Sequence, residues 1–363
     1  MKQSSFIVLE NGQVFKGESF GAIGEAVGEI VFTTGMTGYL ETLTDPSYYG
    51  QIVVQTFPLI GNYGVIPADF ESSSPQLKAY IVREWCQAPS NFRSEGELDT
   101  FLKMHNIVGV YGIDTRELTK IIREVGVMNA KITTTLDDID EVLAEIKNYR
   151  IINAVQEVGT REISVSKGVS GGYKVVLWDF GAKENIRREL MKRGCEVITV
   201  PALTTAEKIV NLKPDGIMLS NGPGDPADNK EIIKEVSNLT NSGIPIFGIC
   251  LGHQLLALAQ GAKTAKLKYG HRGANQPVKD LKTGRVYITS QNHGYAVMAD
   301  SLPASASVSF INANDETCEG IDYKNMPAFS VQFHPEASAG PLDTSFLFDQ
   351  FIDLMREECS KCR

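Results

Sequence analysis

The chain has 363 residues, of which 42% are hydrophobic and 22% are charged, and its net charge is −9. This length predicts two domains, and the composition is that of an ordinary globular protein. An acidic balance without any cluster of lysines and arginines argues against nucleic-acid binding and against a role at membrane surfaces.

The N-terminal sequence becomes polar too soon for a secretory signal, since MKQSSF is followed by only a short apolar run. No apolar run approaches the roughly 18 residues of a membrane span. We therefore expect a cytoplasmic protein, in which an even number of cysteines says little about disulfides.

The first domain is expected to be a compact mixed β/α domain over residues 1–152. Strand-like alternation at residues 6–9, the turn signal Asn11-Gly12 and a second apolar pair predict a β-hairpin. A buried strand is predicted at residues 51–56. Helical periodicity follows around residues 118–124 and 137–149.

A linker is predicted over residues 153–172, whose second half is rich in glycine and serine. The pattern changes from residue 173 onward, where short apolar strands alternate with helical stretches. Strands are predicted at residues 173–178, 195–200, 216–220 and 244–249, with a helix at 185–193. This alternation predicts βαβ units and a parallel sheet over residues 173–363.

A strand-to-helix turn around Cys250 carries the strongest functional signal. The buried strand runs into Gly248-Ile249-Cys250-Leu251-Gly252, and a helical pattern follows at once. This is the nucleophile-elbow pattern of hydrolases, with Cys in place of Ser. The glycines avoid crowding at a sharp turn, and the N-terminus of the helix favours the thiolate. A buried core cysteine is the alternative, but the two glycines favour a catalytic nucleophile.

A His-Pro-Glu tripeptide supplies a candidate base for this thiol. Pro335 disfavours helix at the residue before it, so we expect extended backbone with His334 and Glu336 on one side. A carboxylate beside an imidazole fixes the tautomer and stabilises the charged form of the ring. An ordinary turn would also explain the tripeptide, but the elbow upstream favours catalysis.

The loop at residues 219–226 is a further candidate. It follows a strand at the sheet edge where α/β folds bind ligands, and Gly222 and Gly224 can present backbone N–H groups to an oxyanion. An ordinary turn is the alternative there too.

Other sequence signals are weaker. His293 is the rival base, but it has no carboxylate two residues away, and His253 and His271 have no catalytic spacing. Residues 179–181, Asp-Phe-Gly, lack the other motifs of a kinase. No Gly-Lys dipeptide and no Gly-x-Gly-x-x-Gly occurs, so we expect no nucleotide at a familiar loop and no metal. The terminal Cys359 and Cys362 form a lone CxxC, for which a solvated tail is expected rather than a zinc site.

Cys250, His334, Glu336 and the loop at residues 222–224 together resemble the triad (class I) glutamine amidotransferases, over residues 173–363. The second half alone does not distinguish among the enzymes that contain such a domain, which include GMP synthetase, anthranilate synthase and CTP synthase. The first domain decides among them. Its segments FTTGMTGY, LTDPSY and QIV resemble the small subunits of carbamoyl-phosphate synthetase, as do residues 221–226 and 292–294.

This resemblance implies a doubly wound, flavodoxin-like α/β fold for the second domain. It implies a glutaminase that converts glutamine to glutamate and ammonia through a Cys thioester. The ammonia passes through a channel to a large subunit, which uses bicarbonate and ATP to make carbamoyl phosphate for arginine and pyrimidine synthesis. The first domain would contact that subunit and contribute to the glutamine site. ATP and Mg²⁺ would act on the large subunit, with no cofactor in this chain. Assembly of the two subunits into a higher-order hetero-oligomer is also possible under this resemblance.

The same resemblance implies roles for single residues. Cys250 would attack the carboxamide carbon, His334 would relay the proton to ammonia, and Glu336 would orient His334. The oxyanion hole would consist of the N–H groups of Gly224 and Leu251. Glutamine would be held by Ser47, Gly222, Gly224, Leu251, Gln254, Asn292, Gly294 and Tyr295. Tyr295 stands where bacterial relatives often have Phe, and residues 269–276 are less His-rich than the family pattern.

Two other functions are weighed against this one. A catalytically silent regulatory or scaffold subunit would lack the thiol, whereas this chain keeps all three triad residues. A stand-alone cysteine hydrolase of the same fold would have no use for the first domain.

Overall fold

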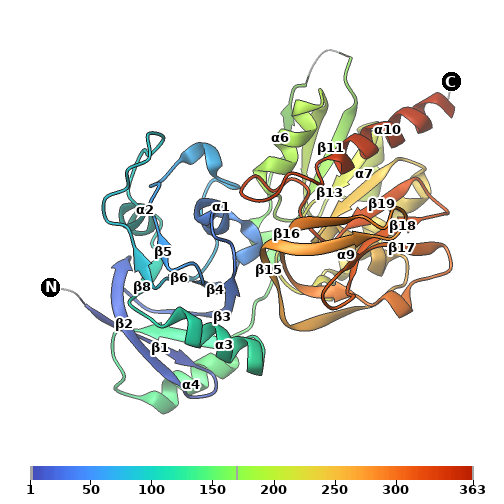
Figure 1. Cartoon of the computed structure of the whole chain (residues 1–363). Coiled ribbons are helices and arrows are strands. Elements are labelled where there is room, and N and C mark those ends of the chain that lie inside the picture. Colours follow the sequence, from blue (N-terminus) through green and yellow to red (C-terminus); the bar gives the residue numbers. More distant parts are fainter. Residues whose placement is uncertain (1–2, 169–170, 362–363) are drawn as a thin grey trace. The chain divides into compact units, whose positions relative to one another are not determined.

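The computed structural model describes residues 3–168 and 171–361 (Figure 1). The chain divides into two compact units, Met1–Ile152 and Asn153–Arg363. Each unit has hydrophobic clusters of its own, and each is described separately below.

The first unit is built around a closed barrel of seven strands within its described residues. The strand order is β1-β2-β8-β6-β4-β3-β9, and antiparallel pairing of β1 with β9 closes it. The strands are β1 (Ser4–Leu9), β2 (Val14–Gly21), β3 (Ala26–Thr33), β4 (Gln51–Gln55), β6 (Ala79–Ile81), β8 (Val108–Tyr111) and β9 (Met128–Thr133). A separate pair consists of β5 (Leu59–Ile60) and β7 (Glu84–Trp85).

Helices interrupt the barrel strands: α1 (Tyr39–Thr44), α2 (Leu98–Met104), α3 (Thr115–Val125) and α4 (Ile139–Asn148), with the 3₁₀ turns η1 (Pro46–Tyr48) and η2 (Pro67–Asp69). The predicted mixed β/α domain is confirmed. The predicted hairpin is β1–β2, and Gly12 in its turn has a φ of 87°, a conformation that glycine adopts without strain.

The second unit is a ten-stranded sheet in its described part, in the order β10-β12-β11-β13-β14-β19-β18-β17-β15-β16. Its parallel half contains β11 (Lys174–Asp179), β12 (Glu196–Pro201), β13 (Gly216–Leu219), β14 (Ile246–Ile249) and β19 (Ala328–Val331). Its antiparallel half contains β15 (Thr264–Asp280), β16 (Val286–Val297), β17 (Ala306–Asn312) and β18 (Cys318–Tyr323). The predicted parallel strands all form, within two residues of the predicted bounds.

Helices cover both faces of the parallel half, which confirms the doubly wound α/β fold (Figure 1). Successive residues of a strand point to opposite faces. Leu177 accordingly packs in one cluster with α6 (Glu184–Lys192) and α10 (Phe346–Lys361). Val176 packs in the other cluster with α7 (Ala206–Asn211), α8 (Lys230–Leu239) and α9 (Leu251–Ala259). The shorter 3₁₀ turns are η3 (Pro226–Asp228), η4 (Thr240–Ser242) and η5 (Ala299–Ser301).

The segment predicted as a linker, residues 153–172, is more ordered than its composition indicates. It contains α5 (Ala154–Val158) and β10 (Ser164–Ser166), and it belongs to the second unit. β10 adds to the sheet edge by antiparallel pairing with β12. Its small polar residues satisfy their backbone groups against a partner strand, which composition does not reveal.

The end of the described chain is helical rather than a solvated tail, because α10 continues through Cys359 to Lys361. Cys362 lies outside the described residues. No helix within residues 3–168 and 171–361 combines the length and the apolar character needed to cross a membrane.

Candidate active site

Cys250 occupies a strained turn between β14 and α9. Its backbone dihedrals are φ 52° and ψ −103°, a region that residues with a side chain rarely adopt. The backbone holds it there, since its N–H donates to the carbonyl of Val331 over 2.8 Å. Its buried Sγ lies 3.8 Å from the carbonyl oxygen of Asn292 on β16. Strain of this kind is typical of functional positions.

The two glycines of the elbow are required by close packing, as the sequence predicts. A Cβ on Gly248 would lie 2.9 Å from the carbonyl carbon of Gly252. A Cβ on Gly252 would lie 2.3 Å from the carbonyl oxygen of Leu219 on β13. Both contacts are with backbone, which cannot move away as a flexible side chain could.

His334 follows the strand next to the elbow. β14 and β19 pair in parallel with Ile249 opposite Val331, so Cys250 and His334 both follow the carboxyl ends of neighbouring strands. Nδ1 of His334 lies 2.6 Å from Oε1 of Glu336, and both side chains are fully buried. The buried Nε2 of His334 has no hydrogen-bond partner among the described residues.

The extended segment predicted to run from His334 through Glu336 does not continue past His334. The two residues lie in a turn, in which the N–H of Ala337 donates to the carbonyl of His334 over 3.3 Å. Proline disfavours helix at the preceding residue, but a turn satisfies this restriction as well as a strand does. The turn still directs the two side chains toward each other.

Lys183 is a site residue that sequence reasoning missed. Its Nζ lies 3.6 Å from Oε1 of Glu336, and the side chain of Asn185 donates to the backbone carbonyl of Glu336. Burial acts to raise the pKa of Glu336, but the charges of His334 and Lys183 outweigh it and hold that pKa below its usual value. The only sequence motif noted near Lys183 was Asp-Phe-Gly at residues 179–181, which does not indicate a contact with Glu336.

Two loops after neighbouring strands are bonded to each other around Lys183. The side-chain oxygen of Asn221 accepts from the N–H of Lys183 over 2.9 Å, and its amide donates to the carbonyl of Gly181 over 3.0 Å. Gly222 packs so closely that a Cβ would lie 2.3 Å from the carbonyl of Phe180. Gly224 has a φ of 89°, so that the loop after β13 needs glycine at both predicted positions.

The remaining predicted glutamine contacts lie on α9, on β16 and in the first unit. Gln254 of α9 donates over 2.8 Å to the carbonyl of Tyr295 on β16, the strand that also carries Asn292 and Gly294. Leu251 is the first residue of α9, directly after the nucleophile. Ser47 belongs to η1 of the first unit, and its part in binding glutamine stays a prediction.

The other buried histidines have partners of their own. Nδ1 of His293 lies 2.8 Å from the carbonyl of Tyr295, and Nε2 lies 3.1 Å from Oε1 of Gln291. Burial, reinforced by the nearby charge of His271, lowers the pKa of His293 well below its usual value. Burial also lowers the pKa of His253 to about 3. His334 differs from both in the 2.6 Å contact of its Nδ1 with the carboxylate of Glu336.

Comparison with known proteins matches each half of the chain to a family model. The model described as glutamine amidotransferase class-I matches residues 176–354. The model described as carbamoyl-phosphate synthase small chain, CPSase domain, matches residues 7–132.

Similar curated proteins span almost the same length. The carbamoyl phosphate synthase small chain of Fusobacterium nucleatum is 55% identical over 348 residues, which are 95% of this chain and 96% of that protein. The pyrimidine-specific small chain of Bacillus subtilis is 53% identical over 350 residues, 96% and 95% of the two chains. Among solved structures, a glutamine amidotransferase from Thermotoga maritima aligns with a TM-score of 0.38 and 18% identity, over 52% of this chain and 84% of that one.

Proposed function

This chain belongs to the family of carbamoyl-phosphate synthase small chains, with a class-I glutamine amidotransferase domain, and from that premise we propose that Cys250 is the nucleophile with which it hydrolyses glutamine. The observation that carries this proposal is the strained elbow that holds a buried thiol next to the strand leading to His334 and Glu336.

The first half of the reaction forms a thioester. The Cys250 thiolate attacks the side-chain carboxamide carbon of glutamine, and the negative charge moves to the carboxamide oxygen. The N–H groups of Gly224 and Leu251 stabilise this oxyanion, since losing one such donor typically costs about 10²–10³ in rate. His334 gives a proton to the leaving nitrogen, the C–N bond breaks and ammonia departs.

The second half releases glutamate. His334 takes a proton from water, the hydroxide attacks the thioester carbon, and the C–S bond breaks to regenerate Cys250. Glu336 keeps the proton of His334 on Nδ1, which leaves Nε2 to exchange protons with the thiol, the amide nitrogen and water. The positive charge of Lys183 supports an ionised Glu336 throughout.

We further propose that glutamine is bound by Ser47, Gly222, Gly224, Leu251, Gln254, Asn292, Gly294 and Tyr295. The hydrogen bond between Gln254 and the backbone of Tyr295 supports it, because it fixes α9 against β16 beside Cys250.

The partner is proposed to be a large subunit that receives the ammonia and carries the ATP- and Mg²⁺-dependent steps. The first unit exposes large apolar side chains that suit such an interface, among them Phe92 at 94%, Met104 at 77% and Met36 at 72%. We also propose that the enzyme acts in the cytoplasm, where reducing conditions keep a catalytic thiol unpaired.

Trapping the thioester tests the chemistry directly. We expect rapid acid quenching of the complex during turnover of labelled glutamine to leave a glutamyl group on the peptide that contains Cys250. Peptides with Cys195 and Cys318 serve as internal controls, because burial raises the pKa of these thiols to about 11 and about 12. Label on another residue, or none at Cys250 under conditions of steady turnover, would refute the proposal.

A further inference from the structure

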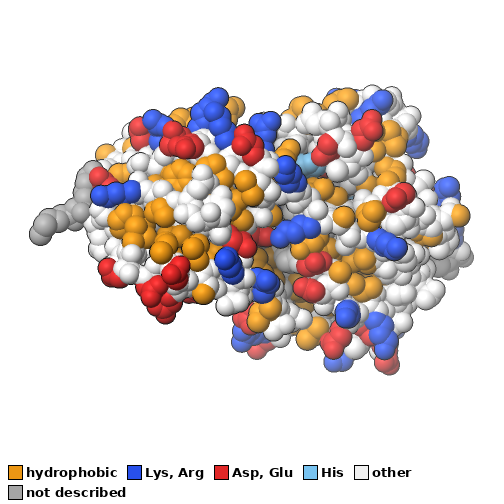
Figure 2. All heavy atoms as spheres, turned by 90° about the horizontal axis from the view of Figure 1, so that it is seen from below, with side chains coloured by type: hydrophobic (Ala, Val, Ile, Leu, Met, Phe, Trp, Pro, Cys, Tyr) orange, Lys and Arg blue, Asp and Glu red, His pale blue; other side chains and the backbone are white. Residues whose placement is uncertain are grey.

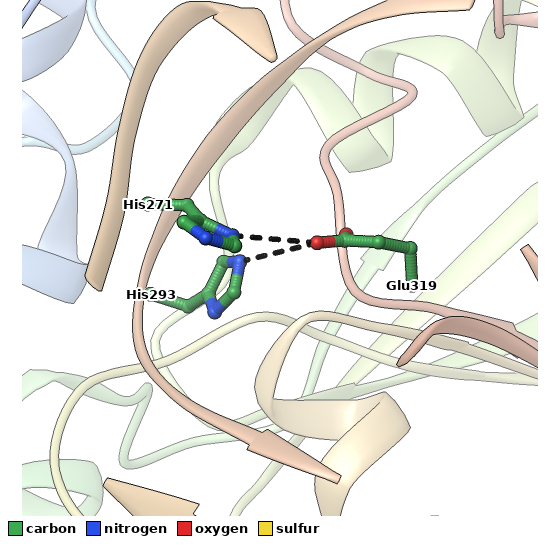
Figure 3. A group of neighbouring side chains, drawn as sticks. All are labelled: His271, His293 and Glu319. Carbon is green, nitrogen blue, oxygen red and sulfur yellow. Dashed lines mark ion pairs between the residues drawn. The ribbon is translucent and has the colours of Figure 1, made fainter. Parts of the chain in front are cut away.

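Three side chains to which the proposed glutaminase reaction assigns no role meet in the antiparallel half of the second unit (Figure 3). His271 lies on β15, His293 lies opposite it on β16, and Glu319 lies on β18. All three are buried, and one ligand atom from each lies within 4.8 Å of the others. The sequence predicted no metal in this chain, so the cluster was not expected.

The separations suit a single small cation. Nδ1 of His271 lies 3.4 Å from Oε1 of Glu319, and Nε2 of His293 lies 3.9 Å from the same oxygen. Zn²⁺ binds imidazole and carboxylate at about 2.0–2.2 Å in tetrahedral sites, which spaces neighbouring ligands roughly 3.4 Å apart. Small side-chain movements therefore bring all three atoms into contact with one ion.

Hydrogen bonds already hold both imidazoles in the tautomer that binds metal. Nε2 of His271 lies 2.8 Å from a carboxylate oxygen of Asp315, and Nδ1 of His293 lies 2.8 Å from the carbonyl of Tyr295. Because both partners can only accept, the ring proton lies on Nε2 in His271 and on Nδ1 in His293. The other nitrogen of each ring then directs a lone pair toward Glu319. Metal-binding histidines almost always donate their other N–H to a carboxylate or a carbonyl in this way.

Gln291 gives an independent sign of a cation. Its Oε1 lies 3.1 Å from Nε2 of His293, although His293 already donates from Nδ1. A neutral imidazole has only one N–H, so two lone pairs face each other there. Turning the amide around would point its nitrogen at Nε2 of His293, but its oxygen would then lie against Oε2 of Glu319 at 3.1 Å and against Thr289 at 3.2 Å, an arrangement that requires a protonated Glu319. A cation that accepts both lone pairs resolves the conflict and takes Gln291 as a fourth ligand.

Another arrangement without metal is a pair of protonated rings. His271 can serve as an imidazolium between Asp315 and Glu319, although the amide nitrogen of Asn312, itself a donor, lies 3.4 Å from its Nδ1 and would face that second N–H. His293 would then need a second proton as well, to donate to Gln291. Two buried imidazolium rings with centroids 5.0 Å apart repel each other and lose their hydration.

We propose that His271, His293, Glu319 and Gln291 form a structural Zn²⁺ site that ties together β15, β16 and β18. Neutral nitrogen ligands with one carboxylate favour zinc over the hard cations Ca²⁺ and Mg²⁺. The four ligands leave no open position, which is the pattern of a structural site rather than a catalytic one.

The test is zinc binding by the full-length chain, read by elemental analysis after dialysis against metal-free buffer. We expect a single tightly held Zn²⁺ per chain. Glu319→Gln, which keeps the shape and the hydrogen bonding, should abolish stoichiometric binding. Asp315→Asn removes only an outer partner and should weaken affinity by about 10–100-fold. A wild-type chain that neither retains nor takes up Zn²⁺ overturns the proposal and leaves a metal-free hydrogen-bond network.

Thiols are the main source of false zinc binding, so matched variants control for them. Cys250→Ser and Cys359→Ser should each retain full zinc, and zinc lost with either thiol would overturn the proposal. Should Glu319→Gln fail to fold, the visible spectrum of Co²⁺ bound to the wild-type chain tests the same ligand set. The site predicts the visible spectrum of tetrahedral Co²⁺ without a thiolate charge-transfer band, and a thiolate band or no spectrum contradicts it.

Discussion

Cys250 and His334 are separated by more than eighty positions in the sequence, yet each follows the end of one of two paired parallel strands. At the scale of single residues, local patterns were enough to predict both. Glycines at fixed spacing pointed to Cys250 as the candidate nucleophile, and a carboxylate two residues away pointed to His334 as the candidate base. The glycines are where the structure needs them, whereas the extended segment predicted from His334 through Glu336 gives way to a turn after His334.

The two candidate bases can be separated by matched substitutions. We expect His334→Asn to lower glutaminase kcat by about 10²–10⁴-fold, because general acid–base catalysis is typically worth that much. His293→Asn should retain far more activity, since both ring nitrogens of His293 face Tyr295 and Gln291. Steady-state kinetics of both variants in the complex checks this, and the reverse ranking would mean that His293 is the base.

Lys183 shows what local patterns cannot find. It lies more than 150 positions from Glu336, so their contact depends on how β11 and β19 are placed within one sheet. No spacing rule connects two such residues, and the Asp-Phe-Gly stretch before Lys183 gave no hint of its charge partner.

A pH profile tests the role of Lys183. The pKa of Glu336 is held below its usual value, with the charge of Lys183 as one cause, so removing this charge raises the pKa. Glu336 then takes up its proton at a higher pH. We expect Lys183→Met to move the acid limb of kcat/KM to higher pH, by about one unit. The control Lys192→Met removes an exposed lysine and should leave the limb in place. An unmoved limb in Lys183→Met would contradict the electrostatic role.

At the scale of elements, apolar runs and periodicity predicted the parallel strands and α6 to within a few residues. Closure of the barrel could not be predicted in this way, because β1 and β9 pair over more than a hundred positions. The linker was mispredicted for the same reason. Whether a Gly/Ser-rich segment pairs at an edge depends on the strand beside it, here β12.

The elbow predicts an effect on stability as well as on activity. A Cβ on Gly252 would press into the backbone of β13, so Gly252→Ala must displace α9 or the strand. We expect a loss of about 1–3 kcal/mol in the free energy of unfolding, the usual cost of overpacking. Urea denaturation measures this loss, and glutaminase activity should fall with it.

Gly24→Ala is the matched control for that substitution, because the nearest atom to its Cβ is a Val108 methyl at 3.9 Å. Its stability and activity should stay close to wild type. Equal stabilities for the two variants would mean that α9 adapts to a methyl group and that the elbow is less tightly packed than the contacts indicate.

At the scale of the whole molecule, the charged side chains of the face drawn in Figure 2 are of both signs. On the face in Figure 2, basic and acidic side chains are interspersed, with no stripe of a single sign. The net charge of −9 agrees with this distribution. The division into a barrel unit and an amidotransferase unit follows the two family models, which cover residues 7–132 and 176–354.

The central claim is that glutamine chemistry at Cys250 supplies the ammonia for a synthesis carried out by the large subunit. Cys250→Ser in the complete complex tests it most directly, with carbamoyl phosphate formation measured from glutamine and, separately, from ammonium. We predict that glutamine-dependent synthesis is lost while ammonia-dependent synthesis keeps close to its wild-type rate. Synthesis from glutamine that persists without the thiol, or equal loss with both nitrogen sources, would contradict the account.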